Sequence, residues 1–219
     1  MTCFRIPTGI LGGTFNPIHI GHLRSAEEIR EAEGLSEIWF LPSAIPPHKD
    51  NIGVSFYHRL NMVRLSVEQC PFFSVLDIEG ARRGPSFSID TLKHLVAEFG
   101  DRRDFYFILG SDAFWGFKTW KDYVLFPEYA KLVIMLRDES GMSDLMGFAQ
   151  SIWTDYRPSA QYPFRLVSRH FNEIIFHKVT NLAISSTKIR ALCSNKRSIR
   201  FLVTDRVDEY ISSNRLYSD

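Results

Sequence analysis

Two histidines, His19 and His22, stand three residues apart and follow the glycine pair Gly12 and Gly13. In the first turn of a helix this spacing places both imidazole rings on one face, where they can donate to phosphate oxygens. The glycines let the backbone approach a ligand closely, and the helix that follows would point free N–H groups at an anion. The pattern therefore favours a phosphate site over its alternatives. These are a plain strand-to-helix turn with two hydrated histidines, and a metal site, for which no carboxylate or cysteine stands nearby at ligand spacing.

Two loops farther along carry polar side chains that also suit a ligand site. His48 and Lys49 follow two prolines, so a stiff turn would deliver them to the same end of a sheet as the histidines. A solvated loop tip is the alternative. Ser86 and Ser88 are candidate N-caps for the next predicted helix, and capping alone would explain them.

A second anion cradle is predicted near the C-terminal end. Ser186 and Thr187 precede Arg190, and hydroxyl and N–H groups at a helix N-terminus bind anions. A capping box is incomplete there, because Lys188 stands where Glu or Gln is required. Ligand binding is therefore the better account of this segment.

A loop in the middle of the chain combines an acidic residue with aromatic ones. Asp112, two residues after Gly110, is placed after a predicted strand, where it can accept hydrogen bonds from a ribose. Trp115, Phe117 and Trp120 follow. One of these aromatic residues is expected to stack on a flat ring, and the others to fill the core.

The elements that must position these residues alternate along the whole chain. Apolar runs at 9–11, 37–41, 73–78, 105–109, 131–136 and 174–179 predict strands covered on both faces, with amphipathic helical patterns between them. Pro7 is expected to limit the first strand. The β-α-β order predicts a mainly parallel sheet, with ligands beyond the carboxyl ends of the strands. Without repeats or a flexible linker, one domain over residues 1–219 is the simpler reading.

Composition excludes several classes of function. The 26 Lys and Arg residues against 25 Asp and Glu leave a net charge of +1, so there is no general field for nucleic acid or an anionic membrane. Three widely spaced cysteines argue against both a disulfide framework and a zinc site. No signal peptide or membrane span is recognisable, and the reducing cytoplasm fits best.

The candidate residues are nearly all phosphate or nucleotide contacts. The sequence has no recognisable Ser/His/Asp set, reactive-cysteine context or carboxylate pair. A phosphate monoester is already ionised at neutral pH, so as a nucleophile it needs neither a covalent intermediate nor a general base. Catalysis would then consist of positioning and charge neutralisation, and orientation alone can contribute about 7–11 kcal/mol.

The segments Gly12–His22 and Ile184–Arg190 together resemble the H-x-G-H and I-S-S-T-x-I-R motifs of the nucleotidylyltransferase superfamily. Within it, Pro46–Lys49, Gly84–Thr91, Gly110–Asp112 and Phe117–Trp120 are similar to the nicotinate-nucleotide adenylyltransferases of bacterial NAD synthesis. The similarity spans nearly the whole chain. It implies an α/β, Rossmann-like, mainly parallel sheet with helices on both faces and a C-terminal helical segment.

The resemblance also implies a reaction and its residues. ATP and nicotinate mononucleotide would give deamido-NAD and pyrophosphate, with Mg²⁺ carried by ATP and no metal site in the protein. ATP would be bound by Gly12, Gly13, Thr14, Phe15, Gly110, Asp112, Ser186 and Thr187. The catalytic contacts would be His19, His22, Lys49 and Arg190. The acceptor would be bound by His48, Ser86, Phe87, Ser88, Trp120 and Arg137, with Trp120 stacking on the pyridine ring.

Departures from the family pattern concern substrate preference more than reaction type. Phe87 and Ser88 stand where Tyr and Thr are frequent, Asn16 replaces a frequent Asp, and Arg137 is followed by Asp-Glu in place of Pro-Gly. The alternatives are the same chemistry on nicotinamide mononucleotide or phosphopantetheine, and a non-catalytic adenine-nucleotide sensor. The sequence does not decide the oligomeric state, and a homo-oligomer is compatible with it.

Overall fold

The computed structural model describes residues 4–47, 53–82, 84–138 and 141–218, within which eight strands form one sheet in the order β3-β2-β1-β4-β5-β8-β7-β6. Neighbours from β3 to β8 pair in parallel, and β7 and β6 extend the sheet with antiparallel pairing. The strands are β1 (Ile6–Gly13), β2 (Glu37–Pro42), β3 (Phe73–Val75), β4 (Arg103–Gly110), β5 (Lys131–Leu136), β6 (Arg157–Pro158), β7 (Arg165–Val167) and β8 (Ile174–Lys178).

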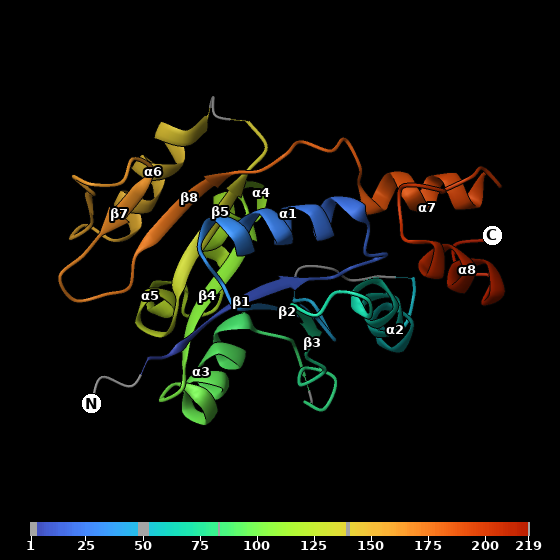
Figure 1. Cartoon of the computed structure of the whole chain (residues 1–219), viewed down its shortest axis with the longest axis horizontal. Helices are drawn as coiled ribbons and strands as arrows, with labels where there is room; N and C mark the ends of the chain where they lie inside the picture. The colour runs from blue at the N-terminus through green and yellow to red at the C-terminus, as the bar shows by residue number, and fades with distance from the viewer. Residues whose placement is uncertain (1–3, 48–52, 83, 139–140, 219) are drawn as a thin grey trace.

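Helices cover both faces of the sheet (Figure 1). One face packs against α3 (Ser88–Phe99), α4 (Ser111–Trp115), α5 (Phe126–Tyr129) and α6 (Met142–Ile152). The other packs against α1 (Ile20–Ala32), α2 (Phe56–Val67), α7 (Ser186–Ser194) and α8 (Asp205–Ser213). Two short 3₁₀ turns, η1 (Phe117–Thr119) and η2 (Tyr123–Leu125), lie before α5. The predicted class, a mainly parallel sheet between helices with a C-terminal helical segment, is confirmed.

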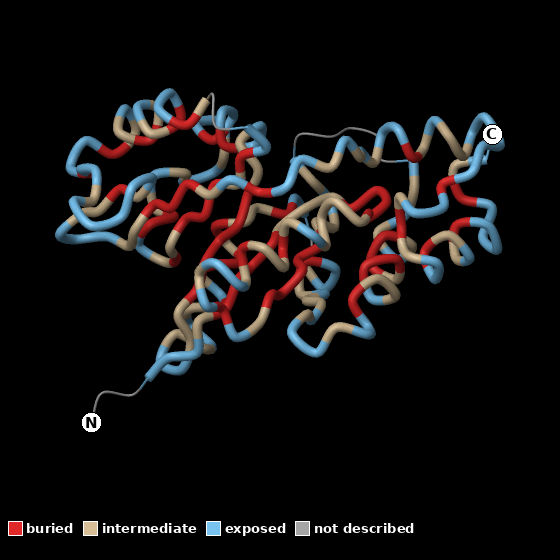
Figure 2. The backbone as a smooth tube through the Cα atoms, turned by 45° about the horizontal axis from the view of Figure 1, so that its top comes forward, coloured by how far each residue is buried: buried red, intermediate tan, exposed pale blue. Residues whose placement is uncertain are grey.

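The central strands are apolar on consecutive residues because each of their faces is buried. In β4, Phe105, Phe107 and Leu109 belong to the core under α3 to α6, while Tyr106 and Ile108 belong to the core under α1 and α2. Successive side chains of a strand point to opposite faces, so both sets need apolar residues. Figure 2 shows the buried backbone concentrated in these central strands.

Pro7 was expected to limit the first strand, and β1 begins one residue before it, at Ile6, with the Pro7 carbonyl accepting from the Ser36 N–H at 2.9 Å. Two local expectations were wrong. The third strand ends at Val75 instead of continuing to residue 78. Neither predicted serine caps α3, since the N-cap is Phe87, without a side-chain hydrogen bond.

The order of the strands determines where a ligand crevice can open. From β1 the chain crosses through α1 to β2 on one side, whereas from β4 it crosses to β5 on the other. The two connections leave a gap beyond the carboxyl ends of β1 and β4, the usual ligand site of such sheets. The glycine pair at the end of β1 and Gly110 at the end of β4 both lie there.

Candidate active site

Two cavities meet at the carboxyl ends of β1 and β4. The larger has a volume of about 460 Å³ and the smaller about 200 Å³. Gly12, Gly110 and Asp112 line both. A ligand in one cavity would therefore lie next to a ligand in the other, beside the three residues that the cavities share.

The histidine pair lines the smaller cavity. The ring centroids of His19 and His22 are stacked 3.7 Å apart, and His22 Nδ1 accepts from the His19 backbone N–H at 3.2 Å. His19 is the N-cap of α1, and its Nδ1 is buried without a hydrogen-bond partner among the described residues. Both rings thus lie at the start of a helix, as the spacing predicted, and the His19 ring carries a buried nitrogen to which no described residue is hydrogen-bonded.

Both imidazoles are neutral at pH 7 in the ligand-free protein. Burial, assisted by the nearby Arg137 guanidinium, lowers the pKa of His19 to about 4. Burial also lowers the pKa of His22 well below its usual value, assisted by His19 and Arg137. Each ring therefore offers one N–H donor, and Arg137 supplies the positive charge of this cavity.

Gly21 and Phe15 explain why the histidines keep this arrangement. A Cβ on Gly21 would lie 3.1 Å from Cε1 and Nδ1 of His19, so a side chain between the two histidines would displace the ring. Phe15 turns the loop in the left-handed region, with φ 47°, and its buried ring packs edge-on against His22 at 5.2 Å. Phe15 lines neither cavity, so its side chain supports His22.

The segment that opens α7 is tied to the loop before α1. Ser185 caps α7 by accepting from the Lys188 N–H at 3.2 Å. Ser186 donates to the Pro17 carbonyl at 2.8 Å, and Arg190 donates to the Asn16 carbonyl at 2.7 Å. The incomplete capping box was therefore a misleading signal, because a serine cap needs no Glu or Gln three residues later.

The loop before α1 and the start of α7 are also held by contacts from α7 itself and from the end of the chain. Thr187 accepts from the second Arg190 amino group at 3.2 Å. Tyr217 donates its hydroxyl to Asn16 Oδ1 at 2.6 Å, and burial raises the pKa of this phenol. The loop that carries the first motif is thus held by the second motif and by the last described residues.

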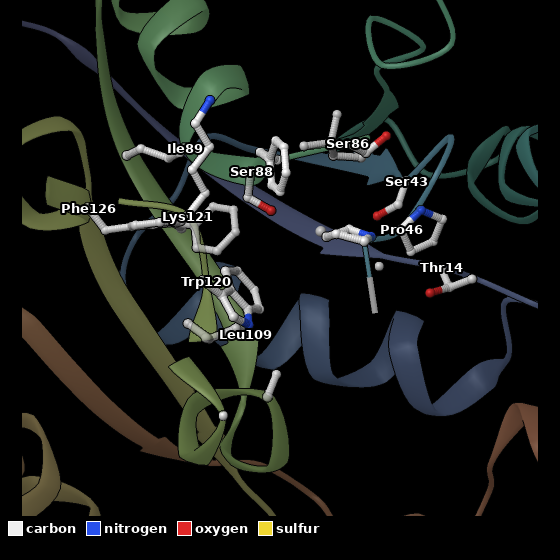
Figure 3. Close-up of a pocket in the computed structure, with 18 of the residues that line it drawn as sticks. Thr14, Ser43, Pro46, Ser86, Ser88, Ile89, Leu109, Trp120, Lys121 and Phe126 are labelled. Atoms are coloured by element: carbon white, nitrogen blue, oxygen red, sulfur yellow. The ribbon is translucent and has the colours of Figure 1, made fainter. Parts of the chain in front are cut away.

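The larger cavity has an apolar, aromatic wall. Trp120 lies between Phe107, Phe117 and Phe126, with ring centroids at 6.3, 5.1 and 5.9 Å. Figure 3 shows Trp120 and Lys121 on one side of the cavity and Thr14, Ser43 and Pro46 on the other.

One of the three aromatic candidates lines this cavity. Trp120 does so, whereas Phe117 is fully buried and Trp115 is half exposed against Phe148. The expectation that a single one of them faces a ligand agrees with this arrangement.

Polar groups of the larger cavity come from α3 and the loops beside it. Ser86, Phe87 and Ser88 line it, although the Ser86 hydroxyl already accepts from the Ala44 and Ile45 N–H groups at 3.0 and 3.1 Å. The N–H groups of Ser88 and Ile89 belong to the first turn of α3, where no helical carbonyl precedes them. The loop and helix start therefore offer backbone donors to an anion.

The structure separates several predicted residues from their groups, and two more lie outside the described residues. Gly13 and Thr14, predicted for ATP, line only the larger cavity, and four others line neither cavity: Phe15, Ser186, Thr187 and Arg190. Arg137 lines the smaller cavity with the histidines, apart from the other residues expected to bind the acceptor. His48 and Lys49 lie outside the described residues.

Sequence reasoning missed several residues of the larger cavity and its support. Lys121 lines the cavity, bonds the Asp90 carboxylate at 2.8 Å and lies 5.0 Å over the Phe87 ring. Glu79 also lines the cavity and is almost completely buried. Arg59 is completely buried and does not line the cavity itself. Lys121 could have been predicted, because it directly follows Trp120 in the sequence. The burial of Arg59 and Glu79 could not be inferred from the sequence.

The described part of the chain shows neither a cluster of metal-ligating side chains nor a helix that could span a membrane. It contains no group of three or more His, Cys, Asp or Glu side chains that could hold a metal ion. None of its helices is long and apolar enough to cross a membrane.

Comparison with known proteins agrees with this geometry. The sequence model of the cytidylyltransferase-like family matches residues 10–192. Proteins named probable nicotinate-nucleotide adenylyltransferase from Geobacter metallireducens and Citrifermentans bemidjiense are 43% and 41% identical, with 96% of this chain and 98% of each relative covered. The solved Plasmodium falciparum nicotinic acid mononucleotide adenylyltransferase complexed with NaAD has a TM-score of 0.71 at 21% identity, covering 96% of this chain and 97% of that chain. This last likeness shows the fold.

Proposed function

Because the chain belongs to the nicotinate-nucleotide adenylyltransferases, within the cytidylyltransferase-like family, we propose that it transfers the adenylyl group of ATP to nicotinate mononucleotide. The products are deamido-NAD and pyrophosphate, and the reaction belongs to NAD biosynthesis. The observation that carries the proposal is the pair of cavities with a shared wall of Gly12, Gly110 and Asp112. Such a pair suits two nucleotides that react with each other.

ATP would occupy the side of the smaller cavity. Gly12, which lines both cavities, lets its phosphates approach the backbone, while Gly13 lines the larger cavity. His19 and His22 donate to the phosphates, and Asp112 meets a ribose. Arg190 is fixed beside this loop by its bond to the Asn16 carbonyl, and with Ser186 and Thr187 it would meet the β and γ phosphates. Arg137, predicted for the acceptor, is reassigned to this side because it shares a cavity with the histidines.

Nicotinate mononucleotide would occupy the larger cavity. A volume of about 460 Å³ is within the range of small-molecule sites. Trp120 would stack on the pyridine ring, and the first N–H groups of α3 would meet its carboxylate, since a helix N-terminus favours an anion. Lys121 adds a positive charge to the same wall. A neutral carboxamide in that place would lose the attraction to both.

The chemistry requires only positioning and charge stabilisation. An oxygen of the acceptor phosphate attacks the α-phosphorus of ATP in line, forming one P–O bond as the bond to the bridging oxygen breaks and pyrophosphate leaves. No proton has to be removed from an ionised phosphate. The neutral histidines donate hydrogen bonds to oxygens on which charge develops, and Arg190 supplies a fixed positive charge.

Mg²⁺ would enter with ATP. The described residues build no metal cluster of their own, and Asp112 is the carboxylate that lines both cavities. This donor set fits an ion held mainly by the triphosphate. Bound there, Mg²⁺ would neutralise charge on the phosphate oxygens.

The test is pyrophosphate release by the purified protein with MgATP and either nicotinate or nicotinamide mononucleotide. We expect kcat/KM to favour the nicotinate form by about 100-fold or more, equivalent to roughly 2.7 kcal/mol. Comparable rates would refute a pocket that reads the carboxylate. Release with neither acceptor would refute the proposed reaction.

A further inference from the structure

Arg59 on α2 is completely buried. Its hydrogen bonds go to backbone carbonyls, and not to the side chain of any residue predicted to bind a substrate or to take part in catalysis. Its guanidinium donates to three backbone carbonyls, to Thr14 and Ser43 at 2.7 Å each and to Ala44 at 3.0 Å. Burying a guanidinium carries a large desolvation cost. Both terminal amino groups of Arg59 are satisfied by these carbonyls, whereas its Nε is buried without a hydrogen-bond partner among the described residues. The planar guanidinium can donate to several carbonyl acceptors in a fixed geometry, which a lysine ammonium cannot do.

The three carbonyls belong to the two chain segments that leave β1 and β2. Thr14 follows the glycine pair, and Ser43 and Ala44 follow β2 directly. Thr14 and Ser43 line the larger cavity, as do Pro46 and Pro47, which continue the second segment. One side chain therefore fixes two neighbouring walls of that cavity relative to each other.

Ser86 holds the same segment from the opposite side. Its hydroxyl accepts from the N–H groups of Ala44 and Ile45, and its own N–H donates to the Ile45 carbonyl at 2.8 Å. Arg59 therefore bonds the carbonyls of Ser43 and Ala44, and Ser86 bonds mainly the amides of Ala44 and Ile45. We call these contacts on residues 43–45 the clamp. Burial lowers the pKa of Arg59, and electrostatic interactions with Tyr217 and with buried Glu79 partly offset this effect.

We infer that Arg59 is a positioning residue for the acceptor, setting the shape of the larger cavity through the carbonyls of Thr14, Ser43 and Ala44. The inference rests on the proposed function for the identity of the acceptor. The hydrogen bonds of Arg59 do not reach residues that line only the smaller cavity. Thr14 follows the glycine pair assigned to ATP, whereas Ser43 and Ala44 belong to the segment after β2. A change at this position should therefore affect the ATP side less than the acceptor side.

The decisive variant is Arg59→Lys, which keeps the charge but replaces a planar fork that spans three carbonyls by a single ammonium group. Arg64→Lys is the matched control, because Arg64 lies on the same helix with an exposed side chain bonded to Asp77 at 2.8 Å. Pyrophosphate release gives both Michaelis constants. We expect Arg59→Lys to raise the acceptor KM about tenfold, the effect of losing a hydrogen bond or two, and to leave the ATP KM within about twofold.

A readout without substrates separates this inference from the proposed reaction. Hydrogen–deuterium exchange at the amides of residues 43–45 should be faster in Arg59→Lys than in wild type and unchanged in Arg64→Lys. If wild type releases no pyrophosphate, the proposed function fails, and the exchange result alone decides the clamp. Unchanged exchange in Arg59→Lys would overturn the clamp.

The kinetic outcomes are equally sharp. An unchanged acceptor KM in folded Arg59→Lys, or an equal rise in both Michaelis constants, would overturn the positioning role. If Arg59→Lys does not fold, Ser86→Ala tests the clamp from its other side. It must raise the acceptor KM more than the ATP KM, and parallel changes in the two would overturn the inference.

Discussion

Acidification is expected to destabilise the fold through the buried imidazole of His19. Burial and the Arg137 charge lower its pKa to about 4 in the folded protein, whereas an unfolded chain has the ordinary value of about 6.5. Between these values the unfolded state binds the proton and the folded state does not. Stability is therefore fully present above pH 6.5 and is lost as the pH falls toward 4.

The magnitude follows from the two pKa values. At pH 5 nearly every unfolded chain carries the proton, but only about a tenth of folded chains do, so stability changes by about 1.2 kcal/mol per pH unit. Integrated from pH 8 to pH 5, the loss is about 2 kcal/mol. His22 acts in the same direction, because its pKa is also lowered. Such a loss is a substantial fraction of an ordinary folding free energy of about 5–15 kcal/mol.

The assay is urea unfolding at pH 8 and pH 5 for wild type, His19→Gln and the control His94→Gln. His94 lies on α3 with a half-exposed side chain near Glu98. Wild type and the control should lose equal stability between the two pH values, and His19→Gln should lose about 2 kcal/mol less. A loss in His19→Gln as large as in wild type would refute the reasoning, whatever its absolute stability.

Three further outcomes concern activity. His22→Ala should lower kcat about 100-fold or more with little change in ATP KM, as for removal of a donor to developing charge; equal losses in both would exclude a transition-state role. Gly21→Ala should reduce kcat about tenfold, because its Cβ would lie 3.1 Å from the His19 ring. The control Gly147→Ala, in helix α6 with nothing within 4 Å of its Cβ, should retain full activity. Trp120→Ala should raise the acceptor KM about tenfold at unchanged ATP KM, and a rise in ATP KM instead would place its ring on the other nucleotide.

Local signals in the sequence were sufficient for the parallel part of the sheet and for the main motif. The consecutive apolar runs that became β1, β2, β4, β5 and β8 are readable because strands buried on both faces cannot tolerate polar side chains. The contact between His19 and His22 could likewise be predicted, because residues three apart on one helical turn lie next to each other. The short strands β6 and β7 were missed because two or three residues leave no periodic pattern.

The sequence by itself therefore determined the order of the main elements and the fold class, and it predicted which residues are able to contact phosphates. Tertiary structure decided which of them share a cavity, moving Arg137 to the histidines and assigning Arg59 to the carbonyls of the two loops. It also decided that the histidines are neutral. The physical reason is that burial and electrostatic environment depend on segments far apart in the chain. Arg190 and Asn16, bonded at 2.7 Å, are separated by 174 positions.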